Sequence, residues 1–147
     1  MKHLSKWIFI SMLIAGCSSN PDSVQALKAW DDKYEECFIS NQTKRHFPDN
    51  PWFNSLSLED KKIVIGYLYN YNSRSCISRE VETLRSALQR EGNDSLLHIF
   101  EADLSPLESV SLDAIKHLDQ QELRKLQSEY SQPFNLSEII ESLNLYN

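Results

Sequence analysis

The stretch 57-SLEDKKIVIGYLYNYN-72 decides the fold of this chain. Its opening serine can cap a helix, and two acidic residues stand in the first turn, where the helix dipole stabilises negative charge. Apolar side chains then alternate with period two, as in a strand, but Val64 and Leu68 between them are apolar as well. A segment that is apolar on all sides fits a central helix packed between others. We therefore expect a helix over 58–71, and a strand over 63–71 stays the alternative.

A second helical pattern follows closely. Apolar residues at steps of three and four form one face: Ile77, Val81, Leu84 and Leu88. Charged residues are set mainly around the outside, and Gly92 is a helix stop. We expect a separate helix over 75–91.

The chain on either side also predicts helices. A first helix should begin at Asp22 or Ser23, because apolar residues recur at helical steps: Val24, Leu27, Trp30, Tyr34, Cys37 and Phe38. Further starts are predicted at Asp94 or Ser95, at a capping box from Ser105 to Glu108, at Asp119 and at Ser137. Six or seven short helices make an all-α fold, a compact irregular bundle that forms one domain over 23–147.

Residues 41–55 are the longest predicted loop, since Pro48 and Pro51 interrupt any helix. Three bulky aromatic residues lie in this loop: Phe47, Trp52 and Phe53. One interpretation is a flap that tucks these side chains into the core. The other is an exposed aromatic patch, which would be the candidate surface for a protein partner.

The first residues have the parts of a secretory signal. Lys2 and Lys6 precede an apolar run of about ten residues, well short of the ~20 that a membrane-spanning helix needs. Small residues and Cys17 end the run. The polar residues 18–22 then read as a tether that reaches at most ~17 Å.

The order Ile14-Ala15-Gly16-Cys17 resembles the lipobox of bacterial lipoproteins. The resemblance covers residues 1–17 only. It implies that residues 1–16 are cleaved and that the Cys17 thiol carries a diacylglycerol, with a further acyl chain on the new amino group. Three chains would hold the protein on a membrane, since one chain alone binds reversibly. Ser18 after the cysteine implies sorting to the outer membrane, facing the periplasm.

Two cysteines remain once Cys17 is lipidated, namely Cys37 and Cys76. In an oxidising compartment they most simply form one disulfide, which would join the end of the first helix to the start of the third. Two separate buried thiols are the alternative. The remaining histidines lack ligand-like spacing to one another or to the cysteines: His46, His98 and His117. We therefore expect no metal site and no cofactor.

Charge and motifs bound the function. Beyond residue 16 the chain has 13 basic and 21 acidic residues, a formal net charge of −8, which argues against a nucleic-acid partner. The chain has no GxSxG, HExxH or phosphate-binding glycine loop. The pair Glu108-Ser109 resembles that of lytic transglycosylases, but the glycine-rich motif of that family does not follow. We expect no catalytic residues and no enzyme.

These observations predict an outer-membrane lipoprotein that acts as a non-enzymatic accessory of an envelope complex, like a pilotin or scaffold, with an envelope protein as partner. The alternative is an inhibitor or exclusion factor that blocks a hydrolase, a phage or a competing element. Exposed Trp52 and Phe53 would favour an inhibitory loop. A groove lined by residues 67–71 would favour the accessory.

Overall fold

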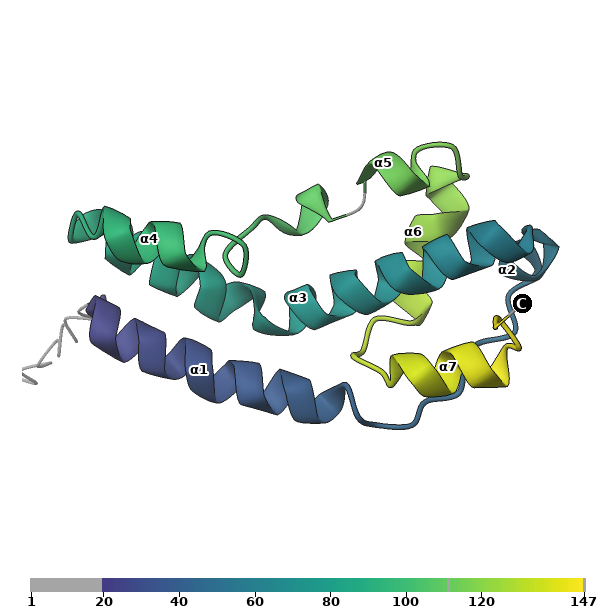
Figure 1. The fold of residues 1–147 in the computed structure, drawn as a ribbon, viewed down its shortest axis with the longest axis horizontal. Coiled ribbons are helices and arrows are strands. Elements are labelled where there is room, and N and C mark those ends of the chain that lie inside the picture. Colours follow the sequence, from purple (N-terminus) through teal and green to yellow (C-terminus); the bar gives the residue numbers. More distant parts are fainter. Residues whose placement is uncertain (1–19, 111, 147) are drawn as a thin grey trace, which may run out of the picture.

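The computed structural model describes residues 20–110 and 112–146, and within them it is all-helical, with seven α-helices, one 3-10 helix and no strand (Figure 1). The elements in order are α1 (Ser23–Ser40), α2 (Pro51–Ser55), α3 (Leu58–Arg90), α4 (Asp94–Phe100), η1 (Leu107–Ser109), α5 (Leu112–Ile115), α6 (Gln120–Glu129) and α7 (Leu136–Ser142). The predicted all-α class is thus confirmed. The predicted signal peptide and Cys17 lie outside the described residues. No helix in the described ranges is long and apolar enough to cross a membrane.

One continuous helix, α3, replaces the two helices expected over 58–71 and 75–91. It is 33 residues long, or about 50 Å, and begins at the predicted Ser57 cap. The strand alternative over 63–71 is wrong. The expected break at 72–74 is absent because no proline or glycine stands there. Asn72, the residue most suited to a break, is instead buried with its side chain directed at a distant loop.

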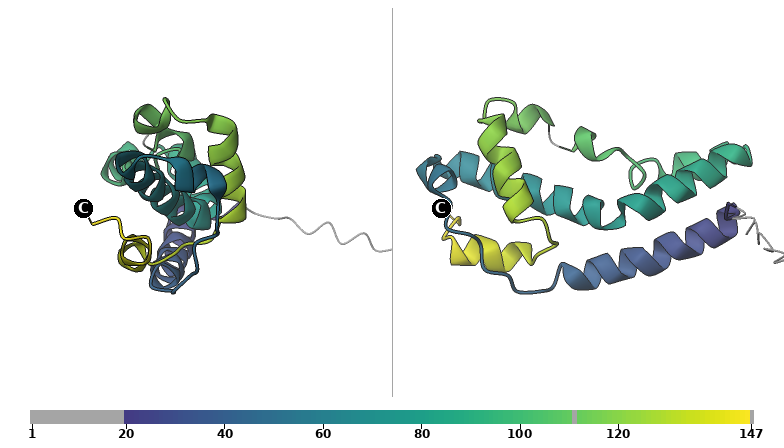
Figure 2. Two further views of the ribbon diagram at one scale, coloured as in Figure 1. Left: turned by 90° about the vertical axis from the view of Figure 1, so that its right-hand side faces the viewer. Right: turned by 180° about the vertical axis from the view of Figure 1, so that it is seen from behind.

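Two hydrophobic clusters form along α3, one at each half. The N-terminal half carries Ile65 and Leu68 into a cluster built with the loop before α2, with α2 itself and with α5 to α7. The C-terminal half carries Val81 and Leu84 into a cluster built with α1 and α4. Because both clusters are built on one helix, α3 holds the two halves of the domain together (Figure 1; Figure 2).

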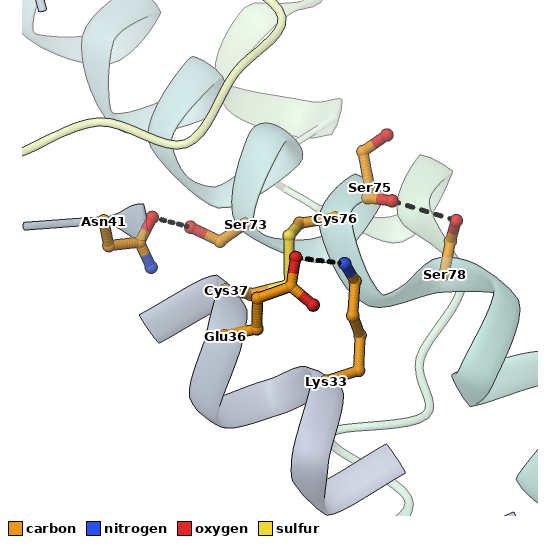
Figure 3. The surroundings of a disulfide bond; sticks show 8 residues. All are labelled: Lys33, Glu36, Cys37, Asn41, Ser73, Ser75, Cys76 and Ser78. Carbon is orange, nitrogen blue, oxygen red and sulfur yellow. Dashed lines mark hydrogen bonds and ion pairs between the residues drawn. A yellow bond between two sulfur atoms is a disulfide. The ribbon is translucent and has the colours of Figure 1, made fainter. Parts of the chain in front are cut away.

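Helix α1 runs antiparallel to α3 and lies along the C-terminal half of α3 (Figure 1). At the start of α1, the Ser23 amide donates to Glu91 Oε1 at 2.8 Å, and Arg90 donates to the Pro21 carbonyl at 2.7 Å. Near its other end, the sulfur atoms of Cys37 and Cys76 lie 2.10 Å apart in a disulfide (Figure 3). Helix α1 is therefore fastened to α3 near both ends.

The disulfide pairs the two cysteines that the sequence suggested, but Cys76 is not at the start of a helix. It lies near the middle of α3, at the junction between the two halves. The difference follows from the missing break, because α3 begins 18 residues before this cysteine. The crosslink therefore joins the end of α1 to the centre of the longest helix.

The segment 41–55 is only partly a loop. Pro51 does not break a helix but begins α2, where its missing N–H costs nothing, and the Asn50 side chain caps the Phe53 amide at 2.9 Å. The flap interpretation describes the aromatic residues best, since Phe47 and Phe53 are 6% and 1% exposed and belong to the N-terminal cluster. Trp52 is half-buried against the same cluster.

Two expected helix starts differ from the structure. The predicted capping box at residues 105–108 is not formed, and the segment makes only the single 3-10 turn η1, without a side-chain cap. The last helix is capped by Asn135 and not by Ser137, through a 3.1 Å bond from the Glu138 amide. The predicted caps at Asp22 and Asp119 are present.

A buried asparagine on α3 holds the long connection between α6 and α7. Asn72 is 1% exposed, and its Nδ2 donates to the carbonyls of Tyr130 and Gln132 at 2.7 and 3.1 Å. These carbonyls follow the end of α6, where the helix leaves no intrahelical donors for them. Asn72 thus fixes the segment that carries Tyr130 and Phe134 into the N-terminal cluster.

We expect Asn72→Ala to lower the free energy of unfolding by about 2–3 kcal/mol, because it leaves the buried Tyr130 carbonyl and the partly buried Gln132 carbonyl without this donor. Asn70→Ala is the matched control, since Asn70 is exposed on the same helix and makes no recorded hydrogen bond. Urea unfolding followed by circular dichroism measures both. Equal effects of the two substitutions would contradict the role given to Asn72.

We expect the double variant Cys37→Ser/Cys76→Ser to lose about 4 kcal/mol of unfolding free energy, because the bond closes a loop of 39 residues in the unfolded chain. A reductant should lower the urea midpoint of the wild type and leave that of the double variant unchanged. A wild-type midpoint that does not respond to reductant would show that the crosslink does not constrain the chain.

Candidate functional site

A cleft of about 280 Å³ lies between α1 and α3, at the junction of the two halves. Ten residues line it: Trp30, Tyr34, Cys37, Phe38, Asn41, Tyr69, Ser73, Arg74, Ile77 and Asp103. Five of these side chains are aromatic or aliphatic, four are polar or charged, and the tenth is the disulfide-bonded Cys37. This composition is typical of a site that binds a ligand or a protein segment.

One wall of the cleft is a row of aromatic residues on α1. Trp30, Tyr34 and Phe38 follow one another at intervals of four, so they lie on one side of the helix. Trp30 is 9% exposed and packs under Tyr34, with ring centroids 5.4 Å apart. Tyr34 and Phe38 are 50% and 56% exposed. The row therefore passes from the core to solvent along the cleft.

The opposite wall comes from α3 and from the segment after α4. Tyr69, Ser73 and Ile77 lie on α3, and the Ser73 hydroxyl donates to Asn41 at 3.1 Å across the end of the cleft (Figure 3). Arg74 donates to the carbonyl of Ser105 at 3.1 Å and to that of Ala102 at 3.4 Å. Arg74 thereby fixes the segment on which Asp103 stands.

A second hollow of about 230 Å³ continues the cleft along α3. The two hollows share Arg74, Ile77 and Asp103, and the second adds Val81 and Leu107 to the lining. Together they make an extended groove, which suits a chain segment better than a compact small molecule.

The indole of Trp30 carries an unused donor. Its Nε1 is inaccessible and has no hydrogen-bond partner in the described part of the protein. A buried indole N–H usually finds an acceptor. Because its N–H has no acceptor among the described residues, Trp30 contributes to the cleft through packing and not through a hydrogen bond. Its ring also makes an edge contact with Phe100 of α4, at 5.4 Å between centroids, and this contact links α1 to α4.

The structure does not assemble the predicted partner surface. Phe47 and Phe53 are buried together, 4.7 Å apart between ring centroids, so they are not available to a partner. The exposed aromatic residues beside the cleft are Tyr34 and Phe38, which belong to the apolar face that the sequence predicts for the first helix. The width of that apolar face could have indicated this exposure. Six apolar positions span more of the helix surface than one neighbouring helix can cover, so some of them must face solvent.

The titratable groups in the described ranges do not converge on a reaction centre. His117 Nε2 lies 2.7 Å from Asp60 Oδ1, and this hydrogen bond, with that from Ser57, holds the pKa of Asp60 below its usual value. Asp60 lies in the first turn of α3, and His117 lies in the segment that follows α5. Burial raises the pKa of Tyr130 to about 12, which keeps the phenol neutral within the core. No group of three or more potential metal ligands is found in these ranges.

We expect Phe38→Ser to change the free energy of unfolding by less than about 0.5 kcal/mol, because more than half of the side chain is already in water. Trp30→Ala, eight residues earlier in the same row, should cost about 3–5 kcal/mol through the cavity it leaves. Thermal and urea unfolding of the two variants test this contrast. A large loss for Phe38→Ser would show that the residue serves the core and not the cleft.

Comparison of the chain with protein-family models, with curated proteins and with solved structures finds no match. The function must therefore be argued from the cleft itself.

Proposed function

We propose that this protein is an outer-membrane lipoprotein that serves as a non-enzymatic binding accessory of an envelope complex, and that a protein partner docks in the cleft between α1 and α3. The observation that carries the proposal is the half-exposed pair Tyr34 and Phe38 beside an apolar hollow. Aromatic side chains next to a pocket are the usual energetic centre of a protein interface.

The position of the cleft favours the accessory over the inhibitor. A groove lined by residues 67–71 was the expectation for an accessory, and Tyr69 is the one residue of that range that lines the cleft. An inhibitory loop would need Trp52 and Phe53 in solvent, whereas Phe53 is 1% exposed. The loop interpretation thus lacks the surface that it requires.

The lipid anchor fits a partner at the membrane. If Cys17 is lipidated, the chain from Cys17 to Ser23 spans at most ~20 Å. Tyr34 lies eleven residues further along α1, a rise of ~17 Å. The cleft would then stay within about 35–40 Å of the bilayer surface, within reach of the periplasmic part of a membrane complex.

We expect a photo-crosslinking amino acid at position 38 to give one discrete protein adduct in intact cells, because Phe38 borders the cleft and faces solvent. The same amino acid at position 112 is the control, since Leu112 is half-exposed on α5, away from the cleft. Cys17→Ser should abolish the adduct if the partner is in the membrane. Mass spectrometry identifies the partner.

The same experiment can refute the proposal. Equal adducts from positions 38 and 112 would show that the cleft is not a docking site. An adduct with a soluble envelope hydrolase that survives Cys17→Ser would support the inhibitor instead.

A further inference from the structure

We infer that the segment received by the cleft is cationic, with a Lys or Arg side chain beside an apolar one. The inference rests on the proposed function, since it names the chemistry of the partner for the same cleft. It follows from the carboxylates that flank the exposed aromatic row.

Two carboxylates stand at helical spacing beside the exposed aromatic residues. Asp31 precedes Tyr34 by three residues, and Glu35 precedes Phe38 by three, so each acid adjoins one exposed ring on the surface of α1. Asp31 and Glu35 are both exposed and four residues apart. They form a negative edge along the solvent side of the aromatic row.

The charges of this edge are less compensated than those on the far side of α1. Lys28 pairs with Asp32 and Lys33 pairs with Glu36, each at 2.7 Å. No ion pair within 4.0 Å involves Asp31 or Glu35 in the described ranges. Lys28 does respond to Asp31, which contributes to its raised pKa after Asp32. The lysines of α1 are nevertheless bound to the opposite row of acids.

The opposite wall of the cleft does not neutralise the negative charge of Asp31 and Glu35. Asp103 lines the cleft opposite α1, and Arg74 is the only cation among the lining residues. The Arg74 guanidinium is engaged by the Ser105 and Ala102 carbonyls. One cation thus stands against Asp103 and the two acids of the α1 edge, which leaves an excess of negative charge around an aromatic site.

Aromatic faces and carboxylates together recognise a cation with an apolar stem. An ammonium or guanidinium group is attracted to the ring faces of Tyr and Phe, and its aliphatic stem can cover them. The neighbouring carboxylates then pair with the charged head and steer the partner toward the cleft. A neighbouring apolar side chain of the same segment would fill the hollow.

A second copy of this chain fits the cleft poorly as an occupant. A two-fold contact between α1 helices would place Asp31 and Glu35 of one copy near the same acids of the other. The formal net charge of −8 that each copy carries beyond residue 16, with 13 basic and 21 acidic residues, adds to this repulsion. A partner of opposite charge meets neither cost.

The test measures the yield of the position-38 adduct in cells that carry paired charge variants. Asp31→Asn/Glu35→Gln removes the edge beside the cleft. Asp32→Asn/Glu36→Gln removes the same charge from the far side of the same helix and is the matched control. We expect the first pair to lower the adduct yield about fivefold, as the loss of two exposed ion pairs predicts, and the second to change it less than twofold.

A defined probe checks the chemistry directly. The full-length lipidated protein in phosphatidylcholine nanodiscs is titrated with a labelled peptide of alternating leucine and arginine, and with the same peptide carrying neutral citrulline for arginine. We expect the arginine peptide to bind at least fivefold tighter, to compete with the position-38 adduct and to lose this advantage in Asp31→Asn/Glu35→Gln.

The outcomes separate the two proposals. A position-38 adduct that persists undiminished in Asp31→Asn/Glu35→Gln would keep the docking site and overturn the cationic partner, as would equal binding of both peptides. An adduct with a second copy of this chain would also overturn it. Equal adduct yields from positions 38 and 112, with no charge substitution present, would refute the docking site itself.

Discussion

The structure depends on one helix that serves two hydrophobic clusters at once. Helix α3 must stay continuous for 33 residues, and it presents different faces to different neighbours along its length. Asn72 shows how this is possible near the junction. Its amide donates to the carbonyls after α6 and does not compete for the backbone of α3. A polar residue that would end a surface helix thus becomes a tie between α3 and the C-terminal segment.

Helix α1 depends on α3 in turn. Its buried surface is narrow, since only Ala26, Trp30 and Cys37 are buried. The hydrogen bonds at Ser23 and the disulfide at Cys37 compensate by holding both ends. Because α1 is fastened by its ends and covered only on one side, its aromatic row can remain partly in solvent. The cleft is therefore a result of how α1 is attached and not a gap left by poor packing.

Local signals in the sequence predicted the helical class, the caps at Asp22, Ser57 and Asp119, and the pairing of Cys37 with Cys76. They could not show that α3 is continuous, because the fate of Asn72 depends on carbonyls about 60 residues away in the chain. They also could not show which residues on the apolar face of α1 are buried in the core and which line the cleft. Composition alone does not distinguish the buried Phe53 from the exposed Phe38. The neighbours that cover each ring decide this.

The disulfide between α1 and α3 has a consequence for recognition. It joins the two walls of the cleft covalently through Cys37, so the walls keep their spacing whether or not a partner is present. A segment that enters a preorganised groove loses its own freedom but does not have to order the receptor as well. If a partner docks in this cleft as proposed, the same contacts would bind it more tightly than two helices free to separate could, and part of that affinity would come from a covalent bond within the receptor.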